Sequence, residues 1–180
     1  MILETERIYL RPWQEDDAKE LYKYASNPNV GLNAGWPVHT SVENSKEVIK
    51  FVLSKPNTFA VVLKDTGKVV GSIGLMIGSQ SNIGLKDTEA EIGYWIGEPF
   101  WGQGLIPEAA KVVIDYGFNE LKLDKIWCGV FVENTKSKRV EEKLGFNYQY
   151  TRENMPCAIE GVLHTVEISS INKNEWLSKR

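Results

Sequence analysis

The chain has 180 residues, a net charge of −3, 42% hydrophobic residues and 25% charged residues. This length and composition suit a single globular domain with a sizeable core. The weak negative charge gives no overall basic character, so we expect no nucleic-acid partner. No apolar run approaches the roughly 20 residues of a membrane span. Residues 1–11 alternate charged with apolar residues, unlike a signal peptide.

The chain contains two cysteines, Cys128 and Cys157. The first lies in a strand-like run and the second in a loop. This arrangement suits reduced thiols better than a disulfide framework. We therefore expect a cytoplasmic protein that does not contact a membrane.

The predicted elements alternate between strands and helices in a regular order. In the first half we expect a strand at 7–11, a helix at 14–26, a loop at 27–40, a helix at 41–53, strands at 59–64 and 68–77, and a polar loop at 78–86. In the second half we expect a strand at 88–96, a helix at 105–119, a strand at 125–132, a helix at 134–144, and strands at 146–151 and 163–171. Hydrophobic periodicity and turn residues set these bounds. The order predicts one α/β domain over residues 1–180, with a mixed sheet and helices on both faces.

A loop with two glycines leads directly into the strongest helical pattern of the chain. Gly102 and Gly104 leave the backbone free to bend, and Pro107 suits a first helical turn. One face of the helix is apolar: Ile106, Ala109, Ala110, Val113, Ile114 and Phe118. A helix start has unpaired N–H groups and a partial positive charge, so this loop suits a phosphate or pyrophosphate. The alternative is a glycine turn that only begins a helix.

Several other site types do not match the sequence. His39 and His164 lack the spacing of metal ligands, so we expect no metal. The dinucleotide-binding fingerprint fails because Pro107 stands where its third glycine should be, and hairpin-linked strands precede the loop. A dinucleotide oxidoreductase is therefore not expected.

Two local motifs carry a resemblance to a known family. The first joins residues 92–96, Ile-Gly-Tyr-Trp-Ile, to residues 100–104, Phe-Trp-Gly-Gln-Gly, and continues through Glu108-Ala109. The second contains Asn134, Ser137 and residues 143–146, Lys-Leu-Gly-Phe. In this order of elements the chain resembles the GNAT superfamily of acetyl-CoA-dependent N-acetyltransferases, in its RimJ/RimL-like branch. The resemblance implies a mixed, mostly antiparallel sheet of six to seven strands flanked by helices, splayed between the fourth and fifth strands.

The resemblance also implies a coenzyme site. It assigns the pyrophosphate of coenzyme A to the backbone of Trp101, Gly102, Gln103, Gly104, Leu105 and Ile106. It assigns the pantetheine arm to the strand end formed by Tyr94, Trp95 and Ile96. Asn134 and Ser137 match positions near the thiol end. The expected co-substrate is acetyl-CoA, with coenzyme A as product and no metal.

The catalytic residues are less clearly marked. Many family members carry a tyrosine general acid where this chain has Glu141, so Ser137 is the candidate acid, and its alternative is a residue in a capped helix turn. Glu91 is the candidate base, and its alternative is an ion-paired strand residue. Trp36 either lines the acceptor site or packs in the core.

Three functions remain open at this point. The first is N-acetylation of a protein or peptide α-amine, as in the ribosomal-protein enzymes of the branch. The second is N-acetylation of a small amine such as an amino acid, polyamine or antibiotic. The third is a coenzyme A-binding regulatory module without turnover. Relatives in this branch are often dimers, so a homodimer is also expected.

Overall fold

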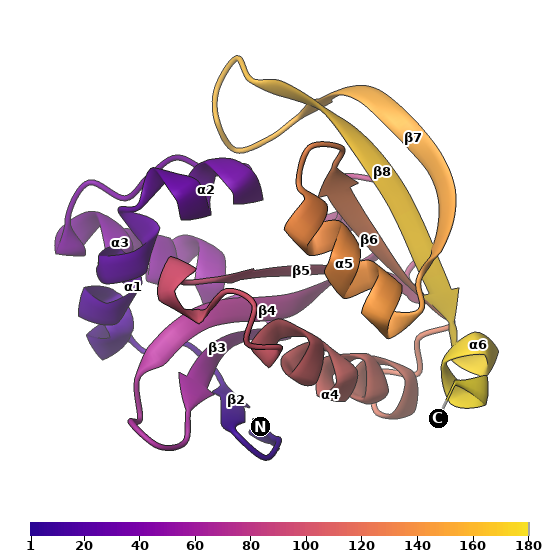
Figure 1. Cartoon of the computed structure of the whole chain (residues 1–180), viewed down its shortest axis with the longest axis horizontal. Helices are drawn as coiled ribbons and strands as arrows, with labels where there is room; N and C mark the ends of the chain where they lie inside the picture. The colour runs from indigo at the N-terminus through magenta and orange to yellow at the C-terminus, as the bar shows by residue number, and fades with distance from the viewer. Residues whose placement is uncertain (180) are drawn as a thin grey trace. The chain divides into compact units, whose positions relative to one another are not determined.

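The computed structural model describes residues 1–179 and has an α/β fold, with helices beside one open sheet (Figure 1). The strand order is β1-β2-β3-β4-β5-β6-β8-β7. The strands are Leu3–Glu4 (β1), Ile8–Arg11 (β2), Thr58–Leu63 (β3), Val69–Ile77 (β4), Glu89–Ile96 (β5), Lys125–Phe131 (β6), Asn147–Pro156 (β7) and Leu163–Asn172 (β8). β5 and β6 run parallel, whereas β6/β8 and β7/β8 are antiparallel. The expected fold class is confirmed. The sheet has one strand more than predicted, because β1 pairs with β2.

The helices are Ala18–Ala25 (α1), Pro28–Ala34 (α2), Val42–Val48 (α3), Leu105–Asn119 (α4), Thr135–Leu144 (α5) and Lys173–Ser178 (α6). Three short 3-10 turns occur at Glu15–Asp17 (η1), Gly78–Gln80 (η3) and Glu98–Phe100 (η4), and a π-helical turn, Ile49–Leu53 (η2), continues α3. Over residues 1–179, no helix has both the length and the apolar character that a bilayer crossing requires.

Two helices differ from the sequence-based expectation. The segment 27–40, expected to be a loop, contains α2. The Asn27 side chain caps this helix by accepting a bond from the Asn29 N–H at 2.9 Å, and Gly35 ends it in the left-handed conformation at φ +82°. The second unexpected helix, α6, begins with a capping box between Asn172 and Glu175. Both helices are short, so capping residues define them more than periodicity does.

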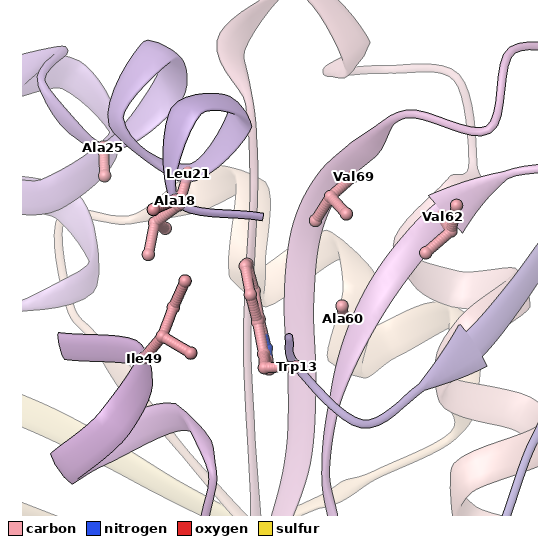
Figure 2. Close-up of a cluster of buried hydrophobic side chains, with 8 residues drawn as sticks. All are labelled: Trp13, Ala18, Leu21, Ala25, Ile49, Ala60, Val62 and Val69. Carbon is pink, nitrogen blue, oxygen red and sulfur yellow. The ribbon is translucent and has the colours of Figure 1, made fainter. Parts of the chain in front are cut away.

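The chain divides into two compact units, which we describe separately. The first unit contains residues 1–74 and 94–112. Its core lies around Trp13, which in Figure 2 stands between side chains of α1 and η2 and side chains of β3 and β4. Trp13 is buried, and its indole nitrogen donates to the Ser72 hydroxyl at 3.2 Å. Helices α1 and α3 pack beside each other in this unit (Figure 1).

The second unit contains residues 75–93 and the chain from 113 onward. Its most extended feature is the long hairpin of β7 and β8 (Figure 1). The register shifts between Tyr148 and Tyr150 and again between Arg152 and Met155. At the end of β8, Trp176 of α6 is buried and donates its indole N–H to Asp115 at 2.7 Å.

Helix α4 and strand β5 have the faces expected from the sequence. All the apolar residues of the α4 pattern are buried: Ile106, Ala109, Ala110, Val113, Ile114 and Phe118. The parallel ladder of β5 and β6 pairs Glu89–Glu91 with Lys125–Trp127. Strand β5 extends to Ile96 and strand β6 extends to Phe131.

Candidate active site

The glycine loop of the first unit connects η4 to α4. Gly102 and Gly104 both have positive φ angles, +74° and +76°, which side chains other than glycine rarely adopt. The space beside Gly102 is open, since an added Cβ would meet no atom within 4 Å. The Trp101 indole nitrogen donates to the Ile96 carbonyl at 2.9 Å. This bond attaches the loop to the end of β5.

The start of α4 presents backbone donors without helical partners. The first helical bond runs from the Glu108 N–H to the Gly104 carbonyl at 3.1 Å. The N–H groups of Leu105 and Ile106 therefore precede the hydrogen-bonded part of the helix. The side chains of these two residues are buried. Together with the helix dipole, such donors make a site suited to an anion such as a pyrophosphate.

A clamp of three residues that the sequence did not reveal holds this loop from the side. The Arg7 guanidinium donates to the Gln103 carbonyl at 2.9 Å and to Glu108 at 2.7 Å. The Thr5 hydroxyl also donates to Glu108. Burial alone would raise the pKa of Glu108, but the hydrogen bonds from Thr5 and Arg7 and the positive charge of Arg7 lower it below its ordinary value. Thr5, Arg7 and Glu108 form the loop clamp.

A second set of contacts joins the start of α2 to η4, which precedes the loop in the chain. The side-chain amide of Asn27 donates to Glu98, and that of Asn29 donates to the same carboxylate at 3.2 and 3.3 Å. Tyr24 packs edge-on against Phe100, with ring centroids 5.6 Å apart. The unexpected helix α2 thus supports the chain that leads into the glycine loop.

The end of β5 lies tightly against β4. A Cβ at Gly71 would clash with the Trp95 carbonyl oxygen, and the Gly97 N–H donates to the Val70 carbonyl at 2.8 Å. Tyr94 and Trp95 are half-buried, while Ile96 is buried. The first unit therefore brings the expected strand residues and the expected loop residues next to one another.

Trp36 belongs to an aromatic cluster in the first unit. Its ring lies 5.7 Å from Trp95 and 5.4 Å from His39, centroid to centroid. His39 is buried, its Nδ1 is 2.8 Å from the Ser45 hydroxyl, and burial lowers its pKa. Trp36 remains half-buried and packs over Gly31, where a Cβ would collide with its ring. The indole thus has packing partners as well as exposed surface.

Glu91, in the second unit, has a half-buried carboxylate with a specific partner. The Ser81 hydroxyl donates to its Oε2 at 2.6 Å. Burial raises the pKa of Glu91, and the hydrogen bond from Ser81 opposes that rise only in part. A carboxyl group with a raised pKa is a better proton acceptor near neutral pH than an ordinary one. The sequence did not single out Ser81, because it lies in a polar loop with no helical or strand pattern.

Helix α5 places the remaining expected residues. The Asn134 side chain caps the helix by accepting from the Ser137 N–H at 3.2 Å, and both residues are half-buried. One turn later, Glu141 is buried and accepts from the Ser169 hydroxyl at 3.2 Å. Burial, partly offset by hydrogen bonds from Cys128 and Ser169, raises the pKa of Glu141 to about 7. No pattern in the sequence indicates that this glutamate is buried.

The two units therefore hold different parts of the expected site. The first contains the strand end, the glycine loop and Trp36, and the second contains Glu91, Asn134 and Ser137. Within residues 1–179, no group of three or more His, Cys, Asp or Glu side chains is arranged to hold a metal ion.

Comparison with known proteins identifies related sequences. Residues 7–147 match the family model described as the acetyltransferase (GNAT) domain. The uncharacterized N-acetyltransferase p20 of Bacillus licheniformis is 34% identical over 179 residues, or 97% of each chain. The putative ribosomal N-acetyltransferase YdaF of Bacillus subtilis is 36% identical over 106 residues, covering 59% of this chain and 57% of its own. The spermidine N(1)-acetyltransferase of Escherichia coli is 30% identical over 145 residues, covering 79% and 74%.

Solved structures with the same fold include two acetyltransferases. A GNAT-family acetyltransferase from Bacillus anthracis superposes with a TM-score of 0.83 at 23% identity, covering 97% of this chain and all of its own. Mycobacterium smegmatis RimJ, solved in complex with CoA-disulfide, superposes with a TM-score of 0.77 at 19% identity, covering 97% of this chain and 88% of its own. At these identities the likeness concerns the fold.

Proposed function

Because this chain belongs to the acetyltransferase (GNAT) domain family, whose members are acyltransferase enzymes, we propose that it transfers an acetyl group from acetyl-CoA to a primary amine. The observation that carries the proposal is the glycine loop at the start of α4, with its positive-φ glycines and the N–H groups of Leu105 and Ile106, which precede the first helical hydrogen bond. The coenzyme bound to the RimJ structure of the same fold supports this choice of donor.

The proposed coenzyme site follows the chain from β5 into α4. The backbone from Trp101 to Ile106 surrounds the pyrophosphate, and the N–H groups of Leu105 and Ile106 at the start of α4 donate to it, because the glycines leave the approach open. The strand end from Tyr94 to Ile96 binds the pantetheine arm. Asn134 and Ser137 bind near the thiol.

In the proposed reaction a C–N bond forms while the C–S bond of the thioester breaks. The neutral amine attacks the acetyl carbonyl carbon, and Glu91 takes the proton that the amine loses. Ser137 donates a proton to the departing thiolate and regains one from solvent, to which Glu91 releases the proton it has taken, so that both side chains return to their starting states. Burial prepares Glu91 for this role, since it raises the pKa of the carboxyl group toward the working pH.

The proposed acceptor is the α-amine of a protein or peptide, with Trp36 lining its site. An α-amine with a pKa near 8 costs about 1.4 kcal/mol to deprotonate at pH 7, while a lysine side chain costs about 4.6 kcal/mol. A site that relies on a single carboxylate as base therefore suits an α-amine, which costs less to deprotonate than a lysine side chain. The likeness to YdaF, named as a putative ribosomal N-acetyltransferase, points the same way. The likeness to a spermidine N(1)-acetyltransferase favours the alternative, a small polyamine.

An acetyl-transfer assay distinguishes these acceptors. The purified protein is given acetyl-CoA and one of three acceptors. The first is a peptide whose only amine is its α-amine, the second is an N-terminally acetylated peptide whose only amine is a lysine side chain, and the third is spermidine. We expect free thiol to appear with the first peptide only. Transfer to spermidine alone would assign a small-amine enzyme, and transfer to no amine would contradict the proposal.

A pair of glycine variants tests the coenzyme site. Gly104→Trp fills the space where the pyrophosphate would lie, so we expect it to abolish the heat of coenzyme A binding in a calorimetric titration. Gly67→Trp is the matched control, because Gly67 has a similar φ of +66° but lies in the β3–β4 hairpin turn with no atom near an added Cβ. Normal binding by Gly104→Trp would show that the coenzyme does not use this loop.

A further inference from the structure

Each oxygen of the Glu91 carboxylate has a close neighbour in the structure. Ser81 contacts Oε2 at 2.6 Å, and the other oxygen, Oε1, lies over Gly129 of β6. A Cβ at Gly129 would lie 3.3 Å from Oε1 and 3.2 Å from a Val166 methyl group. Gly129 therefore provides the room that the carboxylate occupies.

Ser81 is itself held in a fixed orientation. Its side chain is buried, and its Oγ accepts a hydrogen bond from the Ile83 N–H at 3.2 Å. Its own N–H donates to the Gly78 carbonyl at 3.1 Å, within the turn η3. A hydroxyl group has a single proton to donate. An ionised carboxylate can only accept, so Ser81 donates its proton to Glu91 while its oxygen accepts from the Ile83 N–H.

Apolar side chains enclose this pair on the same face of the sheet. Ile83 packs with Val166 and Ile168 of β8, and half-buried aromatic residues of β6 and β7 join them. Such surroundings disfavour the ionised carboxylate, whereas the Ser81 hydroxyl favours it. The apolar surroundings therefore raise the pKa of Glu91, whereas Ser81 lowers it.

The charged and titratable groups on this face have partners of their own. Glu89 accepts from the Trp127 indole at 3.3 Å, and Lys125 lies over the Trp127 ring at 5.0 Å. Farther along the face, Arg152 lies over the Tyr150 ring, and His164 stacks on Phe131 with its Nδ1 3.4 Å from Glu133. Burial raises the pKa of Glu91, and the Ser81 hydrogen bond lowers it.

We propose that Ser81 is the positioning residue of the catalytic base, fixing Oε2 of Glu91 so that Oε1, over Gly129, receives the proton of the attacking amine. This inference rests on the proposed role of Glu91. Ser81 does not touch the substrate and acts only through the carboxylate. Its hydroxyl selects one orientation of the carboxyl group and keeps it ionised at a lower pH than burial alone would allow.

The pH dependence of turnover tests this role in the full-length protein. Ser81→Ala removes a bond to the ionised carboxylate, so the pKa of Glu91 rises and the acidic limb of the kcat profile moves to higher pH. We expect a loss of about tenfold in kcat on the acidic side, which is the effect of one hydrogen bond to a charged group, with recovery as pH rises. Ser81→Thr keeps the hydroxyl and should restore the profile.

Two controls accompany these variants. Ser79→Ala removes an exposed hydroxyl from the same turn, so its profile should match the wild type. Glu91→Gln removes the base and should lower kcat about 100-fold or more, with loss of the acidic limb. The amine titrates identically with every variant, so any displacement of the limb comes from the enzyme. A uniform loss across the whole pH range in Ser81→Ala would overturn the positioning role.

A carboxyl titration by NMR, made without substrates, separates this inference from the proposed function. We expect Ser81→Ala to raise the pKa of Glu91 relative to the wild type. If that pKa does not move while Glu91→Gln still abolishes the acidic limb, Glu91 is the base and the inference about Ser81 is wrong. If the pKa moves but Glu91→Gln leaves turnover unchanged, Glu91 is not the base and its proposed catalytic role is wrong.

Discussion

At the scale of single residues, the ionisation of the buried Glu141 links the stability of the fold to pH. Glu141 lies buried in α5, where the side chains of Ser169 and Cys128 hydrogen-bond to it. In the unfolded chain its pKa is near 4.5, whereas in the fold it is about 7. The folded state therefore holds the proton more tightly, and the stability that this proton gives is complete below pH 4.5 and lost as pH rises through 7.

Replacing this glutamate should change how stability depends on pH. Glu141→Gln keeps the shape and an acceptor for Ser169 but carries no charge, so we expect it to be more stable than the wild type at pH 8, by on the order of 2 to 3 kcal/mol. At pH 4.5 the two proteins should be similar. Urea unfolding at both pH values measures the difference. Glu142→Gln, on an exposed neighbour, should show no such change, and an equal effect of both variants would contradict the assignment.

At the scale of elements, the loop clamp joins the N-terminal segment to the first turn of α4. The Arg7 side chain is about half exposed, at 46%, so its ion pair with Glu108 contributes little to global stability, roughly 1 kcal/mol or less. Its effect falls on the Gln103 carbonyl, which it binds directly. The clamp therefore matters for the shape of the loop more than for the fold.

Removing the clamp should weaken coenzyme binding and leave the protein folded. For Arg7→Ala we expect the KM for acetyl-CoA to rise several-fold, while the KM for the amine and the melting temperature change little. Steady-state kinetics, with each substrate varied in turn, measures the two KM values separately. Lys64→Ala is the matched control, because it removes an ion pair with Glu4 that involves neither the Gln103 carbonyl nor Glu108. Equal KM values in the two variants would show that the clamp does not shape the site.

Elements with a strong local pattern could be predicted from the sequence. Helix α4 and strand β5 have apolar residues at regular spacing, and both form where expected. Helix α2 was missed although Asn27, Pro28 and Gly35 carry the signals of a start and an end. Its seven residues are too few for a periodic pattern, and Asn and Gly inside it are typical of loops.

The side-chain contacts of the candidate site could not be predicted in this way, because they join separate segments of the chain. Arg7 meets Gln103 across a sequence separation of 96 residues, and Ser81 meets Glu91 because a polar loop folds onto the sheet. Neither contact leaves a periodic trace in the sequence. The burial of Glu141 was hidden for a related reason, since a glutamate in a helix is usually exposed. Local patterns indicate which backbone segments form, while such pairings depend on packing between distant segments.

At the scale of the whole molecule, binding of the donor should appear as added thermal stability. A ligand at about 100 times its Kd stabilises the native state by about 2.7 kcal/mol. For a protein of this size that corresponds to a rise of roughly 5 to 10 °C in melting temperature. We expect acetyl-CoA and coenzyme A to give this rise and NAD and ATP to give none. An equal rise with all four ligands would indicate general anion binding.

The interrupted register of β7 has a consequence for the protein in concentrated solution. As the last strand of the sheet, β7 has an outer row of backbone donors and acceptors on which another chain could build a strand. Its two register shifts, with Asn154 in a left-handed conformation at φ +54°, break the even spacing that such growth needs. We therefore expect this edge to resist strand-by-strand aggregation, and any assembly of copies to use side chains rather than a continued sheet.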